Sequence, residues 1–372
     1  MTEQAKIMAE ALAAREEGTE RCMYTLWGME EPENWIWESV PTADVVNSVV
    51  AGTGRQDWRL LRPFDVPGAD APGGSFRLLY DSEFVRVGRE MFSGPQPCFE
   101  RAGDFDTVLF QFAGHGLVET SFGRFALSPG QALHIPAMVA HRTVGSPSCR
   151  RLVFLVKDRL EVKLDPEATV TETEFEVLAE GASAGSERVP DPVEPADGKV
   201  REHLTHWHSR PDEEYLFERT YSYMVGRADK GPRPTMLRPF DYFEGPPQQP
   251  GPPVRTATLW ESPTFRQRVY ANPGRQPLLH RGYDEDEMWF QFGGHIEQET
   301  EHAAYTVGMG EMSMAEAGIS HTSTSNAGAY RLTTYTNRPL RMVVNPAEAT
   351  QHTHWQLKPT MIRDWPSRQA QV

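Results

Sequence analysis

The stretch GRQPLLHRGYDEDEMWFQFGG, residues 274–294, joins one histidine, four consecutive carboxylates and an aromatic segment that ends in two glycines. The aromatic segment alternates with a period of two, which is typical of a β-strand. FRQRVYANP (265–273) and AYRLTTYTN (329–337) are similar short runs of aromatic and β-branched residues, bounded by Gly, Pro and Asn. Such strands, without helical patterns between them, predict an all-β sandwich or small barrel rather than an α/β fold.

The same stretch is present twice. GPQPCFERAGDFDTVLFQFAG (94–114) aligns with residues 274–294 at an offset of 180, and ten of the 21 positions are identical. Chance would give about one or two identities. The same offset carries GQALHIPAMVAH (130–141) onto GEMSMAEAGISH (310–321) without a gap. The chain is therefore predicted to be a tandem duplication of one β-rich unit.

The boundaries of the two units follow from the repeat and from loop composition. LRPFD occurs at 61–65 and again at 237–241, an offset of 176, and the slip fits an insertion at GPPQQPGPP (245–253). Residues 180–199 are rich in Pro, Gly, Ser and acidic residues, as linkers are. The predicted organisation is a helical lead-in at 1–30, a first half at 31–179, a linker at 180–199 and a second half at 200–372.

Composition excludes several classes of function. The 372 residues include 37 basic and 52 acidic ones, so the net charge is 37 − 52 = −15. A field of that sign repels nucleic acid and anionic membranes. We see no charged-then-apolar leader and no apolar run near the roughly 20 residues that span a bilayer. Cys22, Cys98 and Cys149 are odd in number and far apart, which argues against a disulfide framework. We expect a cytoplasmic protein.

The glycines, histidines and glutamate of the opening stretch have a recognisable spacing. It runs Gly274-x5-His280-x-Gly282-x4-Glu287-x6-Gly294, then Gly310-x10-His321. This spacing resembles the two cupin motifs, G-x5-H-x-H-x3,4-E-x6-G and G-x5-P-x-G-x2-H-x3-N. The second motif is looser, because Glu316 replaces the proline and Asn326 comes one residue late. The resemblance covers both halves and implies a tandem cupin, a pair of jelly-roll barrels.

The largest departure from the motif is Gly282, which replaces the second histidine. Three candidate metal ligands remain: His280, Glu287 and His321. Two imidazoles and one carboxylate leave three open positions on an octahedral metal, an arrangement suited to non-haem Fe(II). A zinc hydrolase needs only one open position, and structural zinc needs none. Loss of this histidine with retention of the glutamate is similar to homogentisate, hydroquinone and 3-hydroxyanthranilate dioxygenases.

The resemblance implies an Fe(II)-dependent, extradiol-type ring-cleaving dioxygenase acting with O2 on a small hydroxylated aromatic, such as the para-diol hydroquinone. It also implies a homo-oligomer, or a heteromer with a smaller subunit. Two alternatives stay open. One is a metallocupin of another class, an isomerase or lyase that uses the metal as a Lewis acid. The other is a non-catalytic cupin that binds a small molecule.

Several assignments around the predicted metal stay open as well. Glu285 competes with Glu287 as the carboxylate ligand, although a solvent-exposed acidic turn over Asp284, Glu285 and Asp286 is the simpler interpretation of that run. Alternation along the strand places Trp289 and Gln291 on the face of Glu287. The candidate catalytic residues are Gln291, Tyr283 and His295. Gln111 occupies the place of Gln291 in the first half, which favours a structural role equally.

The first half keeps little of the ligand set. Glu100 stands where the first histidine is expected, Thr107 stands where the glutamate is expected, and only His141 remains. A single imidazole beside one carboxylate binds a transition metal poorly. The first half is therefore predicted to carry a degenerate site and to serve as a scaffold or an oligomer contact.

Overall fold

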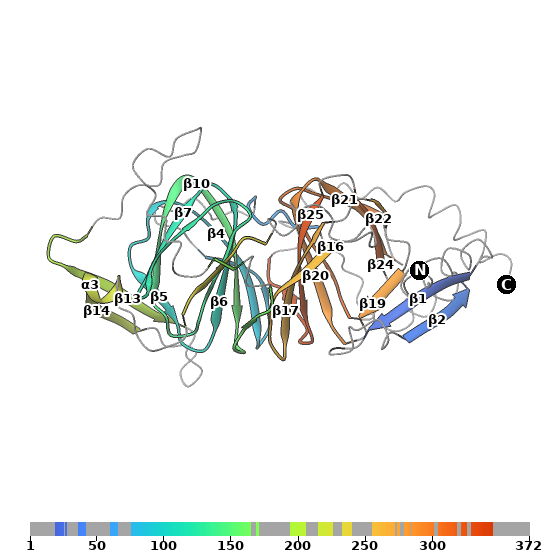
Figure 1. Cartoon of the computed structure of the whole chain (residues 1–372), viewed down its shortest axis with the longest axis horizontal. Coiled ribbons are helices and arrows are strands. Elements are labelled where there is room, and N and C mark those ends of the chain that lie inside the picture. The colour runs from blue at the N-terminus through green and yellow to red at the C-terminus, as the bar shows by residue number, and fades with distance from the viewer. Residues whose placement is uncertain are drawn as a thin grey trace.

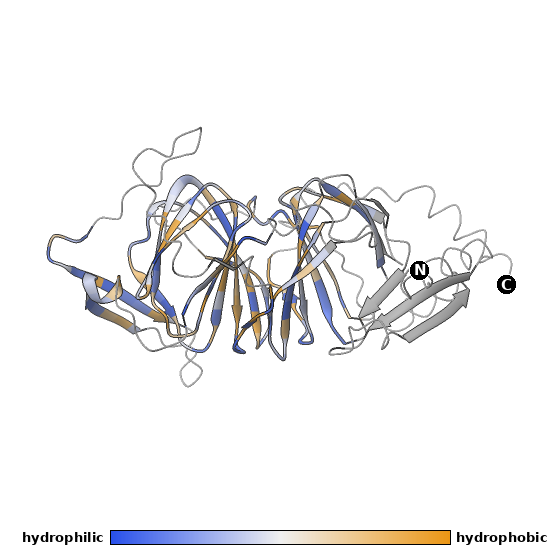
Figure 2. Cartoon of the chain, viewed as in Figure 1, coloured by the Kyte–Doolittle hydropathy of each residue, from blue (hydrophilic) through white to orange (hydrophobic). Residues whose placement is uncertain are grey.

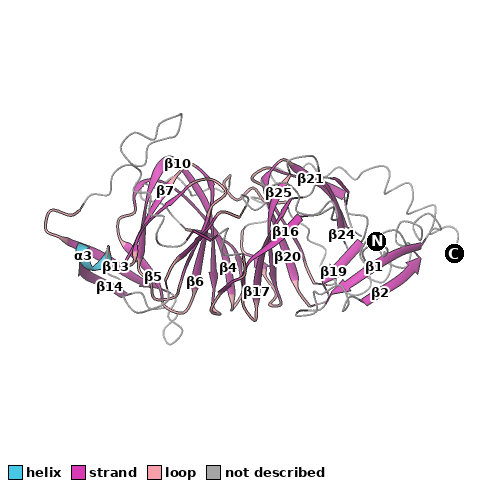
Figure 3. Cartoon of the chain, viewed as in Figure 1, coloured by secondary structure: helices cyan, strands magenta, loops and turns pink. Residues whose placement is uncertain are grey.

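The structure is a computed structural model of the whole chain, and it is built almost entirely of strands (Figure 1, Figure 3). It describes residues 19–25, 27, 36–41, 60–65, 76–164, 169–170, 194–205, 215–225, 233–239, 255–271, 274–275, 279–282, 284–300, 304–317, 321–325 and 329–344. The described segments contain one helix, α3 (Tyr221–Met224). Among these residues no helix has the length and apolar character needed to cross a membrane. The prediction of an all-β fold is confirmed.

The first barrel is formed by eight consecutive strands. They are β3 (Arg77–Asp81), β4 (Val85–Pro95), β5 (Phe99–Ala102), β6 (Asp106–Ala113), β7 (Gly116–Thr120), β8 (Gly123–Leu127), β9 (Ala132–Ile135) and β10 (His141–Val156). The long strand β10 pairs with β4, β5, β6 and β7. Its register shifts between Gly145 and Cys149. Such a shift bends a strand, so β10 belongs to both layers of the barrel.

The second barrel repeats these strands at the offset of 180, except that β4 corresponds to two strands, β17 and β18, and β10 to two others, β24 and β25. They are β16 (Arg255–Glu261), β17 (Phe265–Ala271), β18 (Gly274–Arg275), β19 (Leu279–Gly282), β20 (Asp286–Gly293), β21 (His295–Thr300), β22 (Ala304–Gly308), β23 (Met312–Ala315), β24 (His321–Ser325) and β25 (Tyr330–Thr336). The pairing repeats too, because His141 lies opposite Glu100 and His321 lies opposite His280. The predicted internal duplication is confirmed down to strand register.

The outermost hairpins are exchanged between the halves. Strand β1 (Thr19–Thr25), paired with β2 (Ile36–Pro41), runs parallel to β19 of the second barrel. Strand β13 (Lys199–Thr205), paired with β14 (Tyr215–Thr220), runs parallel to β5 of the first barrel. The two hairpins therefore lie at opposite ends of the molecule (Figure 1).

This exchange changes the predicted boundaries. Residues 19–25 form a strand on the second barrel, whereas the sequence predicted a helical lead-in at 1–30; the amphipathic part of that lead-in, 1–18, lies outside the described residues. The second half was predicted to open at residue 200, but strands β13 and β14 pair with the first barrel. A strand with one exposed edge binds whichever unpaired edge is within reach, and the sequence pattern alone does not name that edge.

The repeated LRPFD segments are exchanged in the same way. Leu61 exchanges two backbone hydrogen bonds of 2.8 Å with Met312 of the second barrel. Leu237, in β15 (Thr235–Leu237), pairs with Ala132 of the first barrel. The positions 132 and 312 are related by the offset of 180, so the leading leucines of the two pentapeptides make equivalent contacts on opposite barrels. This explains why the motif occurs twice.

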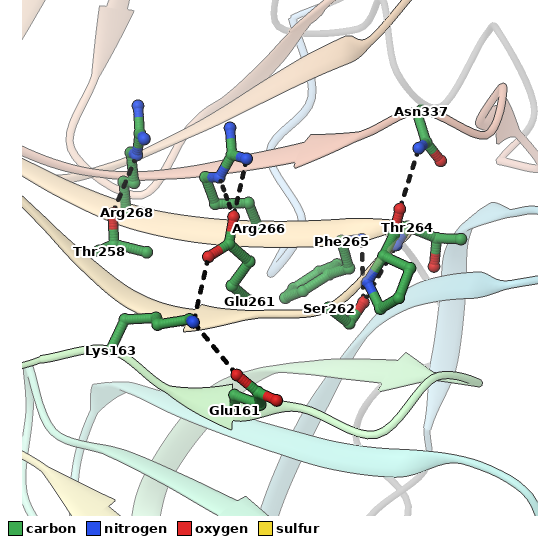
Figure 4. Close-up of polar contacts among 11 residues, drawn as sticks. Glu161, Lys163, Thr258, Glu261, Ser262, Thr264, Phe265, Arg266, Arg268 and Asn337 are labelled. Carbon is green, nitrogen blue, oxygen red and sulfur yellow. Dashed lines mark hydrogen bonds and ion pairs between the residues drawn. The ribbon is translucent and has the colours of Figure 1, made fainter. Parts of the chain in front are cut away.

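Two short strands complete the exchange. β11 (Glu161–Val162) pairs with β16, and β26 (Arg341–Met342) pairs with β3. At the first of these crossings the Lys163 ammonium lies between two carboxylates from different halves, 3.1 Å from Glu161 and 3.6 Å from Glu261 (Figure 4). These side chains are 31–72% exposed, so the ion pairs contribute little to stability. The backbone pairing is the stronger link.

One hydrophobic core crosses from barrel to barrel. Hydrophobic and hydrophilic residues alternate along the barrel strands (Figure 2), and part of the apolar set gathers between the halves. Phe110 on β6 packs edge to face on Phe290 on β20, with ring centroids 6.1 Å apart. Phe112 and Phe292 repeat the contact at 6.2 Å. Both pairs join positions related by the offset of 180, so the repeat packs against itself.

Because this core is shared, we expect Phe110→Ala to destabilise both barrels together. Truncation of a buried phenylalanine costs about 3–5 kcal/mol. Chemical denaturation should be followed by tryptophan fluorescence, to which Trp260 and Trp289 of the second half contribute, and by circular dichroism. Both signals should shift to the same lower midpoint.

The matched control is Leu216→Ala, at a leucine that is 60% exposed on β14, which should change stability by less than about 0.5 kcal/mol. A fluorescence midpoint that Phe110→Ala leaves in place, with only circular dichroism shifted, would show that the barrels unfold independently.

Candidate metal centre

The predicted ligands come from both layers of the second barrel. His280 on β19 and His321 on β24 are direct partners across one sheet, and Glu287 lies on β20 of the facing sheet. The structure describes the side chains of Glu287 and His321, and the backbone alone of His280. Strand pairing therefore fixes the two histidine positions, while the barrel closure brings the glutamate to them.

Glu287 and His321 are in direct contact inside the barrel. The Glu287 Oε2 atom lies 3.0 Å from His321 Nε2, and both residues are buried. Trp289, two positions along β20, donates its indole N–H to Glu287 Oε1 at 2.6 Å. Its ring also packs edge to face on the His321 imidazole, with centroids 4.9 Å apart. One tryptophan thus orients both groups.

The negative charge of Glu287 affects the pKa values of two buried tyrosines. Burial, and then Glu287, raise the pKa of the Tyr305 and Tyr335 hydroxyls above the ordinary tyrosine value. Tyr305 shares a 2.8 Å hydrogen bond with Ser313, and Tyr335 shares one of 2.6 Å with Tyr270. These phenols stay protonated at neutral pH, so they act as hydrogen-bonding groups and not as bases.

The four carboxylates of the acidic run have different environments. Asp284 is exposed and accepts the backbone N–H of Trp27 at 2.9 Å. Glu285 and Asp286 are buried, so the expected exposed turn is wrong for these two residues. Asp286 accepts backbone N–H groups from Ala317 and Leu340, at 2.9 and 2.8 Å. Of the four, Glu287 is the one in contact with His321.

Of the three residues predicted to be catalytic, the structure describes two, Gln291 and His295. Gln291 is fully buried and donates to the Gly293 carbonyl at 2.5 Å. Gln111 donates to the Ala113 carbonyl at 2.7 Å in the first barrel, which favours the structural alternative for both glutamines. His295 is exposed at the start of β21. Tyr283 lies outside the described residues.

The first barrel contains more ionisable groups than the sequence indicated. Glu100 lies opposite His141 on one side and opposite His203, from the exchanged strand β13, on the other. Glu90 is nearby and forms a buried ion pair with Arg151 at 2.5 Å. His203 and Glu90 lie outside both motifs, so motif spacing missed them. The offset of His203 from Met23, 203 − 23 = 180, was the available signal.

Burial sets the ionisation of this cluster. Desolvation, and then repulsion from Glu90, raise the pKa of Glu100 to about 7, although Arg151 acts in the opposite direction. Desolvation, and then Arg151, lower the pKa of His141 to about 4. At neutral pH the His141 imidazole is uncharged and the Glu100 carboxyl is near the midpoint of its titration.

The second barrel fits a divalent metal better than the first. Two donor atoms bound at right angles to one ion, each at about 2.1 Å, lie about 3 Å apart, as Glu287 Oε2 and His321 Nε2 do. Among the described side chains no three of His, Cys, Asp or Glu are grouped for an ion. The described site therefore offers two candidate ligands, the Glu287 carboxylate and the His321 imidazole, with His280 paired in register to His321.

No family model matches this chain, and no curated protein matches it. A solved oxalate decarboxylase of Lactobacillus farciminis, in a formate complex, is similar at 12% identity over 84% of this chain and 98% of that one, with a TM-score of 0.46. A cupin 2 conserved barrel domain protein of Leptotrichia buccalis is similar at 9% identity over 74% of this chain and 94% of that one, with a TM-score of 0.44. A variant of the Bacillus subtilis oxalate decarboxylase is similar at 14% identity over 77% and 79%, with a TM-score of 0.43.

All three likenesses have TM-scores below 0.5. The strand order, the repeated register and the two-layered barrels make the chain a tandem pair of β-barrels, the architecture that the resemblance to the cupin motifs implied.

We expect Glu287→Ala and His321→Ala to abolish tight metal binding, because each removes one of the two described ligands. Glu285→Ala should leave the metal content unchanged. Plasma emission analysis of the purified variants after loading with Fe(II) measures this directly. Loss of metal in Glu285→Ala with retention in Glu287→Ala would exchange the roles of the two glutamates.

The control for the first barrel is His141→Ala, which should keep one metal per chain. Trp289→Phe tests the indole contact, because it keeps an aromatic ring and removes the N–H donor to Glu287. Loss of a group that orients a ligand weakens metal binding by about 10–100-fold. Equal metal loss in His141→Ala and His321→Ala would contradict a single site.

The raised pKa of Glu100 predicts a pH-dependent stability. A carboxyl that binds its proton more tightly when folded stabilises the protein below its unfolded pKa, near 4.5. That contribution is lost as the pH rises through about 7. Relative to wild type, Glu100→Gln should therefore gain roughly 1–3 kcal/mol in unfolding free energy between pH 5 and 8. Denaturant titrations at both pH values test this.

The depressed pKa of His141 acts in the opposite sense, since its stabilising contribution is lost as the pH falls from about 6.5 to about 4. His141→Gln is therefore the matched control and should reduce the loss of stability at low pH. A parallel pH dependence in wild type and Glu100→Gln would mean that Glu100 titrates normally.

Proposed function

We propose that the chain is an Fe(II)-dependent dioxygenase that opens the ring of a small hydroxylated aromatic, with a para-diol such as hydroquinone as the first candidate. The observation that supports it is the buried Glu287–His321 contact, with His280 paired in register to His321. A set of two histidines and one carboxylate leaves positions on iron for both a substrate hydroxyl and O2. The proposal includes assembly as a homo-oligomer or with a smaller subunit.

Bound Fe(II) would supply electron transfer between the ring and O2. The residues of the chain would bind the ion and shield it from water. Glu287 Oε2 and His321 Nε2 would hold the ion, with His280 as the third ligand. Trp289 donates a hydrogen bond to Glu287 Oε1, so this second carboxylate oxygen would not bind the ion. This restricts Glu287 to one oxygen and keeps further coordination positions open.

An apolar cluster excludes water from this end of the barrel. It consists of Leu60, Trp289, Ile296, Tyr305, Val307, Ala315 and Ala329. In such an environment electrostatic interactions are stronger than in water. The protonated Tyr305 and Tyr335 hydroxyls add polarity without adding charge. His295 is not part of this proposal, because it lies at the opposite end of β21 from Thr300, the residue paired with His321.

Oxygen consumption tests the proposed reaction. The protein is loaded anaerobically with Fe(II) and screened in an oxygen electrode with hydroquinones, catechols, gentisate, homogentisate and aminophenols. We expect uptake with at least one of them, and a product that has lost its aromatic absorbance. His321→Ala should abolish uptake, whereas His141→Ala should retain it.

Each of two experimental results would favour a different function. Bound iron without uptake above background favours a metallocupin of another reaction class, an isomerase or lyase. Absence of tight metal binding by wild type favours a non-catalytic binding protein.

A further inference from the structure

The first barrel contains a partly open cavity of its own. Its volume is about 360 Å³, near the lower end of the roughly 300–1,000 Å³ of small-molecule sites. The predicted scaffold role does not explain a cavity that reaches the ionisable cluster. Glu90, Glu100, His141 and His203 all line it.

Strand pairing places three of these side chains next to one another. Strand β5 lies between β10 and β13, and Glu100 is the direct partner of His141 on one side and of His203 on the other. Residues that are paired directly across strands project to the same face of a sheet. One end of the cavity is therefore a row of imidazole, carboxyl and imidazole.

Part of the cavity lining is apolar. Leu109 on β6 and Val153 and Leu155 on β10 line the cavity, and all three are buried in the hydrophobic cluster inside the first barrel. A ligand that fits this space needs a hydrophobic body and a polar group at one end.

Glu100 and His141 together offer a ligand one hydrogen-bond donor and one acceptor. His141 Nδ1 faces the Val139 carbonyl at 3.4 Å. A carbonyl accepts and does not donate, so the imidazole proton is on Nδ1 and Nε2 carries the lone pair. The raised pKa of Glu100 keeps part of its population protonated at neutral pH, and that form donates. A hydroxyl group satisfies both, because it can donate and accept at once.

We propose that the first barrel binds a small neutral phenol, with its hydroxyl between Glu100 and His141 and its ring against Leu109, Val153 and Leu155. Glu90 and Glu100 at the same end of the cavity disfavour an anion, although Arg86 also lines the cavity and Arg151 forms an ion pair with Glu90. A metal is disfavoured because no grouping of His, Cys, Asp and Glu among the described residues suits one. The site is separate from the metal centre and independent of the reaction proposed there.

The pH dependence of binding follows from the groups around Glu100. They are Arg86 and Glu90 from β4, His141 and Arg151 from β10, His203 from β13, and Cys98 from the turn before β5. His141 is neutral above about pH 4, and a phenol stays neutral below about pH 10. Loss of the Glu100 proton therefore removes the donor, and affinity should fall as the pH rises through about 7.

The test uses the full chain carrying His321→Ala, without added metal, so that the second barrel cannot hold a metal-bound phenol. Binding of 4-fluorophenol is measured by ¹⁹F NMR and calorimetry at pH 6 and pH 8.5. We expect binding at pH 6 that weakens about tenfold at pH 8.5. Glu100→Gln should bind equally at both pH values, because the amide keeps a donor.

Glu100→Ala should weaken binding at pH 6 about tenfold, and Leu109→Trp, which fills the apolar end, should abolish it. Benzoate, the anionic control with the same ring, should not bind. If Leu109→Trp does not fold, the Glu100 pair still decides the result. No binding of 4-fluorophenol, or binding that Glu100→Ala leaves unchanged, overturns the proposal.

Discussion

The packing of the repeat against itself is the constraint on which the rest of the structure depends. Phe110 and Phe290 occupy equivalent positions and meet edge to face, so one set of apolar side chains serves as the interface for both barrels. Aromatic pairs in this geometry add to the gain from burial. Once the barrels are held together, the exchanged strands β11 and β26 find their edges within reach, and the outer hairpins close the two far sheets.

The shared framework lets the two interiors diverge. The register that sets His280 opposite His321 also sets Glu100 opposite His141, so the backbone is conserved between the halves while the side chains differ. Replacing a glutamate by Thr107 and a histidine by Glu100 changes the donor set without changing the strands. The second barrel holds the buried Glu287–His321 pair, whereas the first holds the Glu100–His141 pair. Duplication thus separates the two roles in space.

The sequence predicted the strands, the duplication and the Glu287–His321 contact, because each is encoded within a short stretch or a constant offset. It did not predict where the outer hairpins pair. His203 lies on a strand whose partner is a hundred residues earlier, and alternation along β13 carries no information about that partner. The burial of Glu285 and Asp286 was missed for a related reason. A run of charges looks solvated until tertiary backbone donors, such as those of Ala317 and Leu340, are placed around it.

The exchanged hairpin has a consequence for biosynthesis. Strand β1 pairs with β19, and the partners Met23 and His280 are 280 − 23 = 257 residues apart. On a ribosome this strand is synthesised 257 residues before its partner, so its edge stays unpaired until β19 has emerged. Long-range pairing of this kind slows folding and prolongs the exposure of open strand edges. Nascent chains of this architecture are therefore expected to depend on chaperones more than a single barrel of the same composition.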